Sequence, residues 1–186
     1  MPEPHDWKME NLIVSIQKHL ELMSARRHEF NETCFTIFTP QLQMIGEPVS
    51  SHDSRVAFVD ELHKLDAINE FLEDERFLQF AFGEHTLLLD LPSTVITQDE
   101  SERLLKERSG FFHLLGRPNY WPEDDFSSFA EFDPIQRPFI YGDERLAAEE
   151  AAFVLYDLWE LPLEIGFKLH SFSSNHDDWD DQFLKW

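Results

Sequence analysis

The sequence contains one cysteine and six glycines in 186 residues. A single cysteine excludes an intrachain disulfide and a cysteine-rich zinc site. Cys34 lies in the alternating segment TCFTIFTP, where a small buried side chain is favoured over a nucleophile. The few glycines form neither a P-loop nor a G-x-G-x-x-G motif, so we expect no glycine-rich loop that binds phosphate.

Long apolar segments are missing as well. No window approaches the ~20 apolar residues that a membrane-spanning helix needs. The first residues, MPEPHDWKMENL, also lack the apolar core of a signal peptide. These two absences predict a soluble, cytoplasmic protein.

Basic residues are scarce: 15 Lys and Arg stand against 37 Asp and Glu, which gives a formal net charge of −22. A charge of this sign repels phosphate backbones and anionic lipids, so nucleic acid and membrane are disfavoured as partners. A basic protein partner is favoured instead. A charge that only keeps the surface solvated explains the composition equally well.

Motifs for catalysis are also absent, because no G-x-S-x-G sequence occurs and 37 carboxylates are too many to single out an acid/base pair. The best metal candidate is a histidine–aspartate cluster near the C-terminus: His170, His176, Asp177, Asp178, Asp180 and Asp181. A solvated acidic tail over residues 170–186 is the favoured interpretation of this cluster. We therefore predict no catalytic residue, no metal site and no cofactor, with a metal-dependent enzyme as the alternative.

Apolar periodicity does define secondary structure along most of the chain. Helices are predicted over residues 11–27, 56–72, 97–108 and 143–159. Strands are predicted over residues 33–40, 41–48, 77–82, 86–91, 110–115 and, in part, 161–169. Thr97 and Glu100 have the spacing of a helix capping box. This order of elements predicts one α+β domain over residues 1–186, an antiparallel β-sheet flanked by helices.

The segment RFLQFAFGEHTLLLDLP, residues 76–92, predicts a β-hairpin of two central strands, because both runs are apolar on both faces. We expect one face to join the core and the other to form a wall of a binding groove.

A long loop is predicted over residues 116–142, where four prolines, scattered aromatics and an acidic cluster occur together. Its aromatic residues pack into the core or anchor a partner, since aromatics dominate interface hot spots. The residues selected as partner-binding combine aromatic and acidic side chains in this loop and in the tail: Tyr120, Trp121, Asp124, Asp125, Asp177, Asp178 and Trp179.

Residues 76–113 and 143–162 resemble the type III secretion chaperones and YbjN-like proteins, the TY-Chap group. The resemblance lies in the strand with Gln79-Phe80-Ala81, the second strand and helix that follow, and the glycine with aromatics at 110–112. It covers about half of the chain; the 116–142 loop and the tail depart from it. The resemblance implies a helix-flanked antiparallel sheet that binds peptide segments of other proteins without catalysis, often as an acidic dimer.

The sequence thus predicts a non-enzymatic, acidic protein-binding module, either chaperone-like or of the immunity or inhibitor type. Its partner would be a basic or partly unfolded protein, and the module itself is a candidate homodimer. The alternatives are the metal-dependent enzyme and a structural subunit that buries the 116–142 aromatics between chains.

Overall fold

The computed structural model describes residues 4–29, 34–41, 76–113, 134–163, 165–173 and 176–184. Its helical elements are α1 (Pro4–Arg26), η1 (Arg27–Glu29), α3 (Gln98–Glu107), α4 (Glu144–Ala152) and the π-helical continuation η4 (Phe153–Leu158). Its strands are β1 (Cys34–Gln41), β2 (Leu78–Phe82), β3 (Thr86–Leu91), β4 (Phe112–His113), β5 (Ile135–Ile140), β6 (Gly166–Ser173) and β7 (His176–Leu184). No helix in these ranges is long and apolar enough to cross a membrane.

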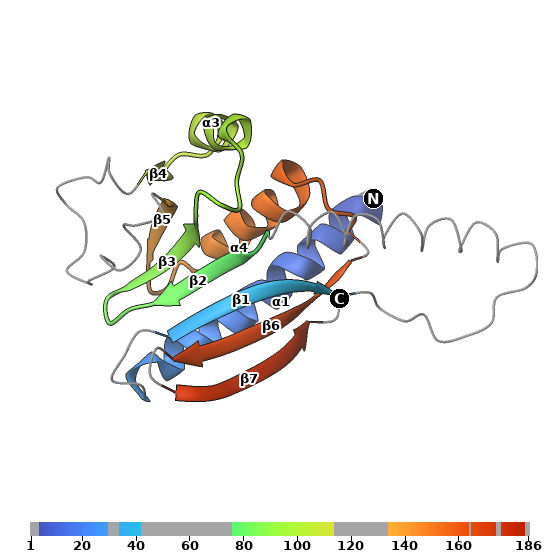
Figure 1. Ribbon diagram of the computed structural model, residues 1–186. Coiled ribbons are helices and arrows are strands. Elements are labelled where there is room, and N and C mark those ends of the chain that lie inside the picture. Colours follow the sequence, from blue (N-terminus) through green and yellow to red (C-terminus); the bar gives the residue numbers. More distant parts are fainter. Residues whose placement is uncertain are drawn as a thin grey trace, which may run out of the picture.

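The strands form one sheet in the order β4-β5-β3-β2-β1-β6-β7, and every neighbouring pair is antiparallel (Figure 1). Strand β1 lies between the β2–β3 hairpin and the β6–β7 hairpin, so it joins segments from opposite ends of the chain. The α+β prediction, an antiparallel sheet flanked by helices, is confirmed.

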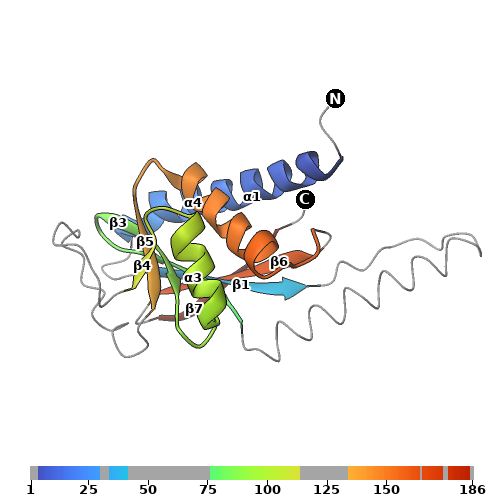
Figure 2. The same cartoon turned by 90° about the horizontal axis from the view of Figure 1, so that it is seen from above.

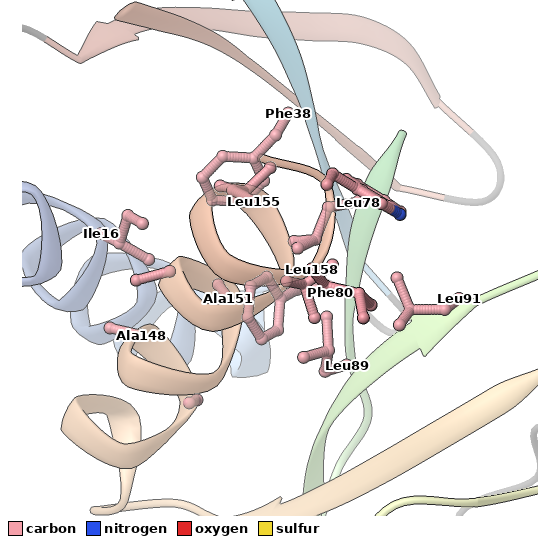
Figure 3. Close-up of a cluster of buried hydrophobic side chains, with 14 of the residues drawn as sticks. Ile16, Phe38, Leu78, Phe80, Leu89, Leu91, Ala148, Ala151, Leu155 and Leu158 are labelled. Carbon is pink, nitrogen blue, oxygen red and sulfur yellow. The ribbon is translucent and has the colours of Figure 1, made fainter. Parts of the chain in front are cut away.

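One face of the sheet carries the main hydrophobic core. Alternation along the strands directs Phe80 of β2 and its cross-strand neighbour Leu89 of β3 to this face. Side chains of α1, α3 and α4, including Ile16, Leu104 and Ala151, complete the same buried cluster. The helices therefore cover this one face, with α1 and α4 running side by side (Figures 2 and 3).

The β2–β3 hairpin predicted from residues 76–92 is confirmed. Its turn is closed by a hydrogen bond of 3.0 Å from the Gly83 N–H to the Thr86 carbonyl, and every residue of β3 is buried. On the face away from the helices, Ala81 and Leu88 have no exposed surface. The prediction that this second face forms the wall of an open groove is therefore wrong at these positions.

Helix α3 begins and ends as its sequence predicts. Thr97 Oγ1 accepts from the Glu100 N–H, and Glu100 Oε2 accepts from the Thr97 N–H, which completes the capping box. After the helix, Gly110 adopts a φ of +94°, which side chains rarely allow. A Cβ at this glycine would also lie 3.2 Å from Nε of Arg137, so the site needs glycine for two reasons.

Several boundaries differ from the prediction. Helix α1 begins at Pro4 instead of residue 11, and β5 occupies residues that were expected to belong to the 116–142 loop. Proline within β5 made that segment resemble a loop. Pro138 pairs with Leu88 of β3 but lies beyond the two β5 residues that pair with β4, Ile135 and Gln136, so at Pro138 β5 has a partner strand on one side only among the described residues. The elements predicted over 41–48 and 56–72 lie, apart from Gln41, outside the described residues.

Candidate functional site

The C-terminal residues form a hairpin instead of the predicted acidic tail. Strand β6 is anchored in the core by Phe167, whose ring centroid lies 6.1 Å from that of Phe38 and 6.2 Å from that of Tyr156. Strand β7, with the sequence HDDWDDQFL, then pairs with β6 at His176 and from Asp180 to Leu184. This segment has no apolar alternation, so its extended structure depends on the neighbouring strand more than on its own sequence.

Strand β7 is an edge strand. Among the described strands it pairs only with β6, and Figure 1 shows it as the outermost arrow of the sheet. An edge strand has a row of backbone N–H and C=O groups that face away from the sheet and can pair with another chain. The register with β6 shifts between Ser171 and Ser173, and irregularities of this kind are frequent at sheet edges.

Three of the residues predicted to bind a partner, Asp177, Asp178 and Trp179, lie on this edge strand. Asp180 and Asp181 follow them, so β7 holds four aspartates. The register shift falls between His176 and Asp180, so alternation places only the paired positions Asp180 and Asp181 on opposite faces of the sheet. The four other predicted residues lie outside the described residues: Tyr120, Trp121, Asp124 and Asp125.

The histidines of the metal hypothesis lie on the same hairpin. His170 is opposite Asp181, whereas His176 is opposite Ser173. The two histidines are thus offset by three residues along the hairpin, or about 10 Å at ~3.3 Å per residue. A metal site joins side-chain atoms and not backbone positions, so the metal-dependent enzyme stays an alternative hypothesis.

Many of the described arginines are paired with glutamates inside the protein. Glu150 of α4 is 2% exposed and contacts two of them. Its carboxylate accepts from Arg108 Nε and Nη2 at 2.8 and 2.7 Å and lies 2.6 Å from Arg137 Nη1. The hydrogen bonds with Glu150 raise the pKa of Arg108, whereas burial lowers the pKa of Arg137. This cluster ties α3 and α4 to β5.

A second ion pair ties α1 to α4. Arg145 donates to both carboxylate oxygens of Glu10 at 2.8 Å and to Glu149 at 2.7 Å. The hydrogen bond from Arg145 lowers the pKa of Glu10. Arg76, two residues before β2, forms a further ion pair with Glu100 of α3, with 2.8 Å between Nη1 and Oε1. The positive charges of these arginines are compensated by the glutamates that they contact. They therefore do not offset the negative charge of the aspartates in β7.

One carboxyl group that the sequence analysis did not select lies at the centre of the sheet. Asp90 of β3 has no exposed surface and accepts a 2.7 Å hydrogen bond from Gln136 of β5. Burial raises the pKa of Asp90 to about 6. The signal in the sequence was a single charged residue inside the apolar run TLLLDL.

Comparisons of the chain with family models, with curated proteins and with solved structures found no match. The fold and the acidic edge strand are therefore the observations from which a function has to be argued.

Proposed function

We propose that this chain is a non-enzymatic binding protein that holds a basic, partly unfolded segment of a partner protein along β7. The observation that carries the proposal is the position of four aspartates on an edge strand. Backbone groups of an edge strand bind an extended segment by strand addition, and neighbouring side chains select its sequence. The four aspartates would select lysine and arginine.

Charge supports the same partner. The formal net charge of −22 attracts a basic chain over a distance and speeds its encounter. Two β7 strands from separate copies would place aspartates opposite or diagonal to aspartates, and like charges in such positions are destabilising. The edge therefore favours a basic partner over self-association through β7. A homodimer formed through another surface stays a prediction.

The resemblance to the TY-Chap group points to the same class of activity, because it implies binding of peptide segments without catalysis. A chaperone-like holder and an immunity or inhibitor protein both fit an acidic edge. They differ in their partner: a chaperone of this kind binds a client before it folds, whereas an inhibitor binds one folded basic protein.

The first test compares two variants of equal charge. One variant replaces Asp177, Asp178, Asp180 and Asp181 with asparagine. The matched control replaces four carboxylates of the helical region: Glu102, Glu107, Asp157 and Glu160, each by its amide. Each immobilised protein is exposed to lysate of its source cell at low salt and eluted in salt steps, and the eluted proteins are identified by mass spectrometry.

We expect the wild type and the control variant to retain the same basic protein, released as salt rises, and the β7 variant to lose it. A synthetic basic peptide from that protein should then bind the β7 variant at least about tenfold more weakly than the wild type. The same peptide with alternate amides N-methylated should also lose binding, since strand addition needs its N–H groups. Equal loss in both protein variants would show charge attraction without a site at β7. An empty eluate from the wild type would contradict the proposal.

A further inference from the structure

Asp90 occupies the middle of the sheet on the face opposite the helices. Its neighbours along β3, Leu89 and Leu91, point into the helix-covered core (Figure 3), so alternation turns Asp90 to the second face. The residues directly opposite are Gln79 of β2 and Gln136 of β5. Asp90 and Gln136 both have no exposed surface, so the pair does not contact bulk solvent.

The pair has two hydrogen-bond acceptors without a donor. Gln136 Nε2 donates to Asp90 Oδ1 at 2.7 Å. Oδ2 of Asp90 and Oε1 of Gln136 are buried, and neither has a hydrogen-bond partner in the described structure. An ionised carboxylate and an amide oxygen are both acceptors only, so the ionised pair cannot satisfy them. Buried acceptors are rarely left without a donor in native proteins.

No charge compensates a carboxylate at this position within the part of the chain that the structure describes. The cross-strand neighbours Gln79 and Gln136 are uncharged, and the described helices lie on the other face. Arg137 of β5 is opposite Leu89 and pairs with Glu150 there, and His113 of β4 is opposite Ile135, also on the helix side. An ionised Asp90 would thus be a buried charge without a counter-charge.

We propose that Asp90 is a protonation site: in mildly acidic solution the folded sheet holds its carboxyl as the neutral acid, and Oδ2–H donates to Oε1 of Gln136 while Gln136 Nε2 donates to Oδ1. The two hydrogen bonds close a ring between the acid and the amide. One proton satisfies both orphaned acceptors and removes the uncompensated charge. The side-chain hydrogen bonds between β3 and β5 therefore depend on pH.

The direction of the pH effect follows from proton linkage. An unfolded aspartate has a pKa of ~3.9, and burial raises the pKa of Asp90 in the folded protein to about 6. The folded state therefore binds more protons than the unfolded state between these values. The stability supplied by the acid–amide ring is full below about pH 4 and is lost as pH rises through about 6. For these values the unfolding equilibrium constant rises by about tenfold between pH 5 and pH 8 through this one group.

The test compares pH profiles of the wild type, D90N and D157N in urea unfolding. Asparagine at 90 reproduces the neutral acid, because its amide donates to Gln136 Oε1 and accepts from Gln136 Nε2. D157N removes the charge of an exposed aspartate and serves as the matched control. We expect D90N to match the wild type below about pH 4 and to have an unfolding equilibrium constant about a hundredfold smaller near pH 8, with about tenfold of that difference arising between pH 5 and pH 8. D157N should keep the wild-type pH profile.

A second measurement does not depend on any variant. Carbon-13 NMR of protein labelled at the aspartate carboxyl carbon follows the titration of Asp90 directly, with D90N supplying the assignment by the signal it lacks. If D90N does not fold, an aspartate signal of the wild type that titrates near pH 6 supports the proposal. An Asp90 signal that titrates near 4, or a D90N variant less stable than the wild type near pH 8, would overturn the proposal.

Discussion

In the central strand β3, one aspartate lies among apolar residues and threonine and is fully buried, whereas the edge strand β7 carries four aspartates in nine residues. The central position removes Asp90 from water and drives it toward the neutral acid. The edge position gives β7 a single partner among the described strands, and its other side is where the proposed basic segment would add. Place in the sheet, more than residue type, decides what a carboxyl group does here.

The largest loss of stability is expected from removing an apolar side chain on which the centre of the sheet depends. We expect Phe80→Ala to lower the free energy of unfolding by about 4 kcal/mol, because Phe80 has no exposed surface and its loss leaves a cavity against the helices. Urea unfolding followed by far-ultraviolet circular dichroism measures the change. Trp7→Ala is the control: Trp7 is 65% exposed, so this truncation should change stability little. Equal effects of the two truncations would contradict the assignment of the core.

The buried ion pairs beside β5 give the next largest effect. We expect Glu150→Ala to destabilise the protein by about 3 kcal/mol, because it removes the carboxylate that Arg108 and Arg137 share in a largely buried site. The control is Glu107→Gln, which removes an exposed partner of Arg103 and should cost less than about 0.5 kcal/mol. Thermal and urea unfolding of both variants measure the difference. A cost for Glu150→Ala no greater than for the control would show that this cluster does not hold α4 to β5.

Local features were the ones that the sequence predicted well. The capping box at Thr97 and the hairpin turn after Phe82 depend on residues within a few positions of each other, so their patterns are visible without a fold. Strand β7 was missed because its sequence lacks alternation and its structure depends on β6. Strand β5 was missed because Pro138 and nearby polar residues resemble a loop.

The Asp90–Gln136 pair could not be predicted from local sequence either. The two residues are 46 positions apart, and only the pairing of β3 with β5 brings them together. The isolated charge in TLLLDL indicated that Asp90 was unusual, but not which residue would face it. Asp177 and Asp178 were selected for their composition alone, and their position on an edge strand came from the structure.

The capping box offers a smaller test, because it lies at the start of α3, away from the sheet centre. We expect Thr97→Ala to lower stability by about 1 kcal/mol, since it removes the side-chain acceptor for the Glu100 N–H. Thr97→Ser keeps the hydroxyl and should restore most of the loss. Urea midpoints of the three proteins measure the series. A serine variant as unstable as the alanine variant would assign the loss to the threonine methyl group instead of the cap.

The smallest expected effect comes from a surface carboxylate whose pH dependence has the opposite sign to that of Asp90. Arg145 lowers the pKa of Glu10 through a hydrogen bond, so the unfolded state binds protons more readily at this position. Its contribution is present above the unfolded pKa of ~4.3 and is lost as pH falls through the lower folded value. Glu10→Gln should therefore lower the unfolding midpoint slightly near neutral pH and match the wild type in strong acid.

The control for Glu10 is Glu21→Gln on the same helix. Glu21 is exposed and bonded to Gln17, and it has no ion pair among the described residues. Its replacement relieves the same unit of negative charge without breaking a contact to an arginine. Both variants are compared with the wild type at low salt and at about 0.5 M salt, where exposed charges are largely screened. Identical midpoints for the two variants at low salt would mean that the Glu10–Arg145 contact adds nothing. A difference that disappears at high salt would place Glu10 with the hydrated surface carboxylates and leave Asp90 as the group whose stabilising form is the neutral one.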